Sequence, residues 1–235
     1  MRVMFQDEAG FGRINKPKSC WCRKGHRPRV PCHHIREYRY VYGAVEPRTG
    51  NSFFLIMPYC NTDCMNVYLS ELSKEYPDDI VITFDDDVIY RDFVIERLYG
   101  AYLEHPGCVC AMRVNKIVFT PDGRTAPYRD WEFEYKNAEG QESHGWLATG
   151  VGGVLYPPYC LDDEVFNLEA LKKLCWTNDD IWLKLAEVMK GTKIIPASNT
   201  SRIEGWQVPG SQEFALWKTN VDGGENDVQI QARSE

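Results

Sequence analysis

Alternating apolar and polar residues predict a group of strands at the start of the chain. Residues 2–6 read as a strand, and residues 38–42 alternate with the period of two that is typical of a strand with one buried face. Glycines within 10–12 indicate a turn after the first of these strands. The turn signal at 47–50 and the apolar run 52–57 predict that the second strand returns as a hairpin.

Helical periodicity alternates with short apolar runs over the rest of the chain. Apolar residues recur on one face over 62–76, over 92–104 and from about 178 to 189, which predicts three helices. The apolar runs 80–84 and 192–196 predict strands, the second at the edge of a sheet. This alternation is typical of an α/β fold built on a mixed, open sheet.

Residues 124–145 differ from both patterns. They are charged and aperiodic, and we expect a long surface loop there. Strands are predicted before this segment, at 108–114 and 116–120, and the glycines of 150–153 follow it.

The charge is unevenly distributed along the 235 residues. The net charge is −7, but residues 1–59 hold 11 Lys and Arg against 4 Asp and Glu, whereas residues 60–235 hold 16 against 30. The basic part predicts weak contact with DNA through residues 13–39, because such contacts neutralise phosphates. The 43% of hydrophobic residues excludes a wholly disordered chain.

Cysteines and termini indicate a cytoplasmic protein. There is no run of about 18 apolar residues to cross a membrane, and Asp7 and Glu8 come too early for a signal peptide. Nine cysteines, an odd number, then predict reduced thiols. Cys20 and Cys22 with residues 32–34 (Cys-His-His) give a zinc hypothesis, although the spacing departs from the usual C-x2-C and thiols in a loop are the alternative.

The acidic run Asp85-Asp86-Asp87 directly follows the apolar run 80–84. Open α/β sheets bind their ligands at the carboxyl ends of strands, so these side chains should lie at a ligand-binding edge. Adjacent carboxylates repel one another and favour a hard divalent cation, Mg2+ or Mn2+. An acidic turn on a solvated surface is the alternative. We expect a metal site at Asp85, Asp86 and Asp87.

Two further motifs carry candidate chemistry. Gly150, Gly152 and Gly153 allow a backbone to approach a bound ligand closely, although a tight turn alone also explains them. Asp179 and Asp180, at the start of a predicted helix, can place a carboxylate against an acceptor hydroxyl as general base. Their alternative role is to stabilise the helix dipole.

Tryptophans supply the remaining candidates for ligand binding. Trp131, Trp146 and Trp182 can offer flat apolar faces to a sugar ring. Tryptophans that pack in a core are the alternative, since large aromatic side chains are mostly buried. Of the three, we assign Trp182 to donor or acceptor binding.

Residues from about 76 to the end resemble a group of bacterial glycosyltransferases with the GT-A fold. The matching segments are 76–90, 149–158, 177–182 and 223–229. The resemblance implies transfer of a sugar from a nucleotide-sugar donor to a hydroxyl acceptor, either a glycan or a lipid-linked one. It implies that Asp85 and Asp87 bind the metal and the donor diphosphate, that Gly152 and Gly153 border the donor sugar, and that Asp179 or Asp180 is the acceptor base.

Residues 2–79 resemble a different family, the catalytic domain of mariner-like insertion-sequence transposases, which has an RNase H fold and three metal-binding acids. The matching segments are 5–13, 36–45, 61–66 and 72–79. The resemblance implies that Asp7 is the first catalytic acid and that Asp85 or Asp86 is the second. The third, a later glutamate on a helix, has no recognisable match. The basic side chains that suit DNA phosphates are Arg13, Lys16, Lys18, Arg23 and Lys24.

The sequence therefore predicts an α/β chimera with a mixed open sheet. Residues 1–79 would form a partial RNase H-like βββαβ unit, and residues 80–235 a GT-A-like catalytic region that lacks its usual nucleotide-binding N-terminal half. The predicted activity is sugar transfer that depends on Mn2+ or Mg2+. One alternative is a DNA endonuclease of the transposase type with Asp7, Asp85 and Asp86 as acids, and another is an inactive fusion remnant.

Overall fold

The computed structural model of the chain describes residues 4–12, 21–26, 37–85, 87–175, 178–198, 205–208 and 223–231. The chain divides into two compact units, Met1–Pro77 and Asp78–Glu235. Each unit combines strands with helices, which confirms the predicted α/β class.

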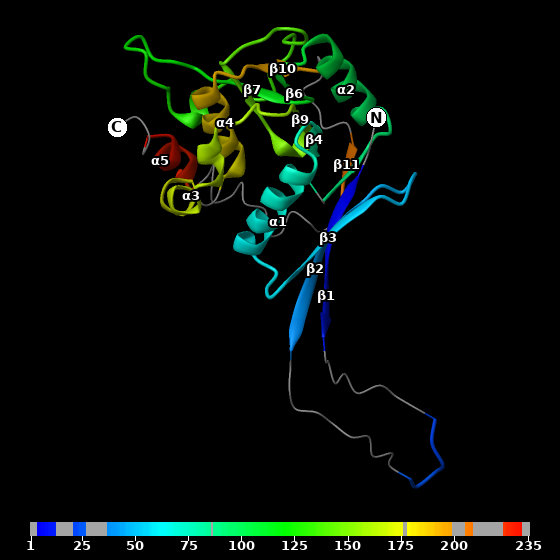
Figure 1. Cartoon of the computed structure of the whole chain (residues 1–235). Coiled ribbons are helices and arrows are strands. Elements are labelled where there is room, and N and C mark those ends of the chain that lie inside the picture. Colours follow the sequence, from blue (N-terminus) through cyan, green and yellow to red (C-terminus); the bar gives the residue numbers. More distant parts are fainter. Residues whose placement is uncertain are drawn as a thin grey trace. The chain divides into compact units, whose positions relative to one another are not determined.

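The first unit contains a three-stranded antiparallel sheet, in the order β1-β2-β3, and one helix (Figure 1). Its elements are β1 Phe5–Gly12, β2 Tyr38–Val45, β3 Ser52–Met57 and α1 Thr62–Glu75. The predicted turn at Gly10 and Gly12 is wrong, because β1 pairs with β2 as far as Gly12. A Cβ at Gly12 would overlap the carbonyl oxygen of Glu37, so this glycine permits close strand approach.

Helix α1 covers one face of this sheet. Its Tyr68 and Cys64 are buried against Tyr42 and Ala44 of β2. The side chain of Asn61 caps the helix by accepting a hydrogen bond from the backbone N–H of Cys64 at 2.9 Å. The predicted helix over 62–76 and the predicted strand at 52–57 are therefore confirmed.

The second unit is built on a mixed four-stranded sheet in the order β10-β6-β9-β4. Its strands are β4 Val81–Thr83, β6 Val109–Ala111, β9 Val154–Tyr156 and β10 Ile194–Pro196. Strand β10 is parallel to β6, whereas β9 is antiparallel to both β6 and β4. Among the described strands, β4 therefore pairs within this sheet, and the first unit is βββα rather than the predicted βββαβ.

Helices and two small strand pairs surround the mixed sheet (Figure 1). The helices are α2 Val94–Glu104, α3 Leu168–Leu174, α4 Asp179–Lys190 and α5 Glu225–Gln231. The pairs are β5 Val88–Tyr90 with β11 Gly205–Gln207, and β7 Val114–Lys116 with β8 Trp146–Ala148. Val94 and Leu98 of α2 are fully buried against sheet residues that include Leu155. Within the described ranges, no helix has the length and apolar character needed to cross a membrane.

The segment 124–145 is not a plain surface loop. Tyr128, Trp131 and Ala138 are buried, and Glu132 forms a β-bridge with Lys116. The prediction was wrong because large aromatic side chains anchor a charged and aperiodic segment to the core without imposing a period on its sequence.

Candidate active site

Asp85 and Asp180 meet at a glycine turn of the second unit. Asp85 follows the carboxyl end of β4, and Asp180 lies in the first turn of α4. A Cβ built on Gly150 would lie 3.3 Å from Oδ1 of Asp85 and 3.4 Å from Oδ1 of Asp180. Two carboxylates that are distant in the sequence therefore flank the same point of the fold.

The start of α4 distinguishes Asp180 from Asp179. The side chain of Asn178 caps the helix by accepting from the N–H of Ile181 at 3.1 Å. The backbone N–H of Gly150 donates to Oδ1 of Asp180 at 2.9 Å, whereas Asp179 is exposed and accepts from the N–H of Asp180. Of these two predicted base candidates, only Asp180 makes this contact with the turn.

The environment of Asp180 changes its acidity. Burial raises the pKa of its carboxyl to about 7, and the negative charges of Asp179 and Asp85 add to the increase. The hydrogen bond from Gly150 and the positive charge of Arg113 act in the opposite direction. This carboxyl can therefore exchange its proton near neutral pH, or lose it to solvent when a cation binds.

The position of Asp85 is fixed by contacts with its own strand connection. Its backbone N–H donates to the hydroxyl of Tyr90 at 3.1 Å, and that hydroxyl donates to the carbonyl of Val151 at 3.1 Å. Gly153 has φ 91°, and a Cβ there would lie 2.6 Å from the ring of Phe84. The glycine turn therefore holds Phe84, and with it Asp85, in place.

The donor set fits a divalent cation of the magnesium type. Among the described residues no group of three His, Cys, Asp or Glu side chains is arranged to hold a metal. Asp85 and Asp180 supply two carboxylates, and Mg2+ commonly takes one or two carboxylates together with waters and substrate phosphates. Asp87 is half-buried, and its carbonyl accepts from the N–H of Val208 at 2.7 Å.

Several predicted residues lie elsewhere or outside the described residues. Asp7 belongs to the first unit, where it pairs with Gly43 and is exposed. Asp86 is outside the described residues. So are the proposed zinc ligands other than Cys22, together with Arg13, Lys16 and Lys18. Arg23 and Lys24 are exposed.

The prediction that Trp182 offers a face to a sugar is wrong. Trp131, Trp146 and Trp182 are 6%, 6% and 5% exposed. Each indole N–H donates to a backbone carbonyl, that of Val165 at 2.9 Å in the case of Trp182. These side chains stabilise the core, because the apolar ring is removed from water while the indole N–H keeps a hydrogen bond.

Other residues of the site carried no local sequence signal. Nδ2 of Asn178 donates to Oδ1 of Asn226 at 2.8 Å, so helix α5 supports the cap of α4. The N–H of Tyr128 donates to Asp227 at 2.6 Å. Arg113 approaches the turn closely, since a Cβ at Gly152 would lie 2.7 Å from the Cβ of Arg113. The one sequence indication was that 223–229 is among the segments in which we saw a resemblance to glycosyltransferases.

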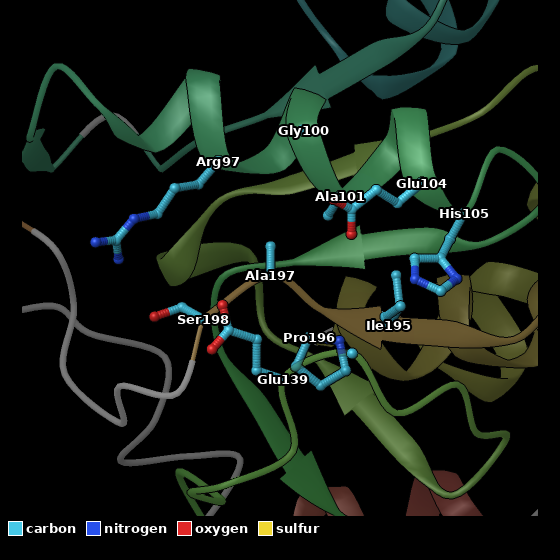
Figure 2. A pocket seen from close by; sticks show the side chains of 11 residues that line it. Arg97, Gly100, Ala101, Glu104, His105, Glu139, Ile195, Pro196, Ala197 and Ser198 are labelled. Carbon is cyan, nitrogen blue, oxygen red and sulfur yellow. The ribbon is translucent and has the colours of Figure 1, made fainter.

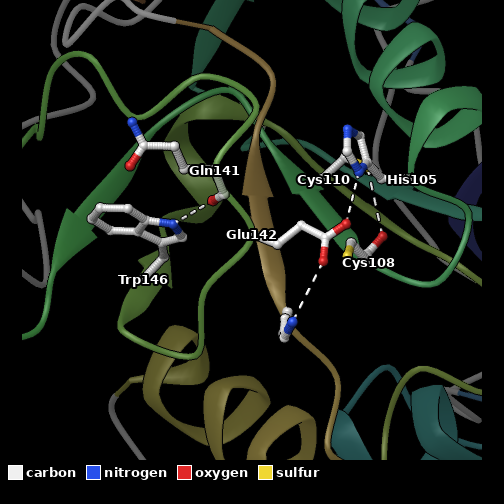
Figure 3. Close-up of polar contacts among 7 residues, drawn as sticks. His105, Cys108, Cys110, Gln141, Glu142 and Trp146 are labelled. Carbon is white, nitrogen blue, oxygen red and sulfur yellow. Dashed lines mark hydrogen bonds and ion pairs between the residues drawn. The ribbon is translucent and has the colours of Figure 1, made fainter.

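A pocket of about 440 Å³ lies apart from these carboxylates, along α2 and β10 (Figure 2). Its lining includes Arg97, His105 and Ser198 but neither acid of the pair. Beside it, Nδ1 of His105 lies 2.8 Å from Oε1 of Glu142, whose Oε2 lies 3.5 Å from Nζ of Lys193 (Figure 3). The hydrogen bond with His105 lowers the pKa of Glu142, and the positive charge of Lys193 acts in the same direction.

A buried charge pair in α4 makes stability depend on pH. Nζ of Lys184 lies 3.4 Å from Oε2 of Glu187, and the side chains are 9% and 2% exposed. Burial raises the pKa of Glu187 to about 7 and lowers that of Lys184. Folded Glu187 keeps its proton to higher pH than in the unfolded chain, so the free energy of unfolding should fall as pH rises from 4.5 to about 7.

We expect Glu187→Gln to remove most of this pH dependence. The free energy of unfolding of the wild type should fall by roughly 2 kcal/mol from pH 5 to pH 8, and that of Glu187→Gln should not show this fall, because an amide does not ionise. Urea unfolding at both pH values measures the change. Glu169→Gln, at an exposed position of α3, should leave the pH dependence unaltered. An equal change in the free energy of unfolding from pH 5 to pH 8 in the wild type and in Glu187→Gln would contradict this explanation.

Comparisons with known proteins identify a family. Residues 2–121, just over half of the chain, match a family model described as "DDE superfamily endonuclease", which confirms the predicted DDE part. Such endonucleases use Mg2+ or Mn2+, in agreement with the expected cofactor. No comparison supports a glycosyltransferase.

Two further comparisons are limited in extent. The chain is similar to the uncharacterized protein y4pE/y4sA of Sinorhizobium fredii (strain NBRC 101917 / NGR234), with 39% identity over 41 residues. The matched segment is 17% of this chain and 30% of the length of that relative. No solved structure matches the chain. On the evidence of the family model, the chain belongs to the DDE superfamily endonuclease family.

Proposed function

We propose that this chain is a DNA endonuclease of the transposase type that depends on Mg2+ or Mn2+. The observation that carries the proposal is that the family match includes Asp85, whose carboxylate meets that of Asp180 at Gly150. Asp7 lies within the same match and is the other proposed acid. Asp180 takes part as a further carboxylate, at a position that the family match does not reach.

The chemistry required is phosphodiester hydrolysis. A cation held by Asp85 and Asp180 would neutralise charge on a phosphate oxygen. The N–H of Gly150 keeps one oxygen of Asp180 in a fixed direction, which leaves the other oxygen for a ligand. Because the pKa of Asp180 is raised to about 7, cation binding should release a proton and strengthen as pH rises through 7.

Plasmid nicking tests this proposal. The wild type should convert supercoiled plasmid to nicked circles in Mg2+ or Mn2+ and not in EDTA. Asp7→Asn and Asp85→Asn should each reduce the rate at least about 100-fold, because each removes a carboxylate that we propose for metal-dependent cleavage. Equal nicking rates for the wild type and a variant that carries both Asp7→Asn and Asp85→Asn would count against the proposal. Failure of the wild type to nick DNA would also count against it.

A second candidate is sugar transfer from a nucleotide-sugar donor by residues 80–235, which lie within the second unit. The arrangement of Asp180 at the start of α4, beside the glycine turn and Asp85, favours it. In this function Asp180 is the general base for an acceptor hydroxyl, Asp85 with Asp86 and Asp87 holds the cation, and Gly152 and Gly153 border the sugar.

Donor hydrolysis separates the two functions. A glycosyltransferase site should release nucleoside diphosphate from a nucleotide-sugar in Mn2+, and Asp85→Asn should abolish the release. Asp180→Asn should then still bind Mn2+, because in this case Asp180 is a base and not a ligand. A chain that nicks plasmid and releases no diphosphate from a panel of nucleotide-sugars excludes the second candidate.

A further inference from the structure

Arg113 is placed directly against the turn that joins the two acids. Its carbonyl accepts from the backbone N–H of Thr149 at 3.2 Å, one residue before Gly150. A side chain at Gly152 would collide with Arg113, since a Cβ there would lie 2.7 Å from the Cβ of Arg113. The backbone of Arg113 and the glycine turn are therefore fixed relative to each other within the second unit.

The guanidinium of Arg113 is held at one nitrogen, whereas another has no partner among the described residues. Nη2 lies 3.0 Å from Oε1 of Glu134, and the backbone N–H of Glu134 donates to Oδ1 of Asn115 at 2.9 Å. Nε is buried, and within the described parts of the chain nothing accepts its hydrogen bond. A buried donor without an acceptor is costly, and the side chain of Arg113 as a whole is 18% exposed, so a change of its rotamer can bring the guanidinium to an acceptor outside the described residues.

The positive charges near this position favour an anion as the ligand of Arg113. The charge of Arg113 acts on Asp180, whose pKa it lowers, so the guanidinium is within electrostatic range of the cation site. A ligand bound there meets a metal ion and an arginine together. Phosphate oxygens suit both, because guanidinium binds them through paired N–H groups and Mg2+ accepts them as ligands.

We propose that Arg113 binds a phosphate group of the substrate beside the cation held by Asp85 and Asp180. The inference rests on the proposed function for the location of the cation. The phosphate belongs either to the DNA backbone or to the diphosphate of a nucleotide donor, and both present the same oxygens. Arg113 is thus a substrate-binding residue that the sequence did not single out.

Calorimetry with inorganic pyrophosphate in saturating Mn2+ tests this inference on the full chain. We expect the wild type to bind, Arg113→Ala to bind at least about tenfold more weakly, and Arg113→Lys to lie between them, since lysine keeps the charge but loses the fork. The matched control is Arg124→Ala, because Arg124 is 83% exposed and pairs only loosely with Asp122 at 3.5 Å. It should bind within about twofold of the wild type.

Competition identifies the source of the phosphate. Displacement of pyrophosphate by a short DNA duplex supports the backbone phosphate, and displacement by a nucleoside diphosphate supports the donor. Mn2+ binding without pyrophosphate, measured well above pH 7 so that Asp180 is ionised in both proteins, should be retained in Arg113→Ala, which separates loss of the anion contact from loss of the metal. If Arg113→Ala is not folded, Arg113→Lys decides the question.

Three results would overturn the inference. They are equal pyrophosphate affinity in the wild type and Arg113→Ala, affinity in Arg113→Lys equal to the wild type when Arg113→Ala does not fold, and failure of the wild type to bind pyrophosphate in Mn2+. A chain that nicks no plasmid but binds pyrophosphate through Arg113 refutes the endonuclease and leaves this inference standing. The two failures are therefore distinguishable.

Discussion

Asp180→Asn is expected to lower metal-dependent turnover at least about 100-fold, whether Asp180 acts as cation ligand or as general base. Asparagine keeps the size of the side chain and an oxygen that can accept from Gly150, so the start of α4 should remain folded. What the variant loses is the negative charge beside Asp85. Turnover of plasmid and of nucleotide-sugar, measured from pH 5 to pH 9, checks this result.

The matched control for Asp180 is its neighbour Asp179. Asp179→Asn removes the same charge from an exposed position, where the side chain accepts from the backbone N–H of Asp180. Its turnover should stay within about fivefold of the wild type, and its pH profile should move to lower pH because the charge of Asp179 raises the pKa of Asp180. If the two variants lost activity equally, the assignment of Asp180 would be wrong.

Gly153→Ala is the second change with a large expected effect. Gly153 has φ 91°, and its Cβ would lie 2.6 Å from the ring of Phe84, next to Asp85. We expect a loss of about 2–4 kcal/mol in the free energy of unfolding, from backbone strain and from displacement of the ring. Mn2+ affinity should fall as well, since Phe84 is adjacent to Asp85 in the chain.

Gly123→Ala separates the two contributions. Gly123 has φ 83°, but nothing lies within 4 Å of its Cβ position, so only the strain applies. Its cost should be about 1–2 kcal/mol, with no change in Mn2+ affinity. Urea unfolding and Mn2+ titration of both variants make the comparison. Similar costs, together with unchanged Mn2+ affinity in Gly153→Ala, would show that the turn does not position the site.

The fold was predictable wherever the chain carries its own boundaries. Asn61 begins α1 and Pro77 follows its end, so both limits were visible in the sequence. Gly10 and Gly12 misled, because glycine marks close strand approach as readily as a turn. The pairing of β4 with β9 depends on residues more than 60 positions apart, and no local signal encodes it.

The candidate site was predictable in its parts and not in its arrangement. Asp85 and Asp180 were both identified from their positions after a strand and at a helix start. Their approach at Gly150 is a tertiary property. Arg113 was missed because a single arginine has no pattern, and Trp182 was misassigned because burial of an indole depends on packing that the sequence does not display.

Mn2+ binding to the full chain, measured by electron paramagnetic resonance, tests most directly whether Asp85 and Asp180 share one cation. The account predicts that Asp85→Asn and Asp180→Asn each weaken binding at least about tenfold, and that the double variant is little weaker than either, because ligands of one ion are not additive. Unchanged Mn2+ affinity in Asp180→Asn, or fully additive losses in the double variant, would contradict it.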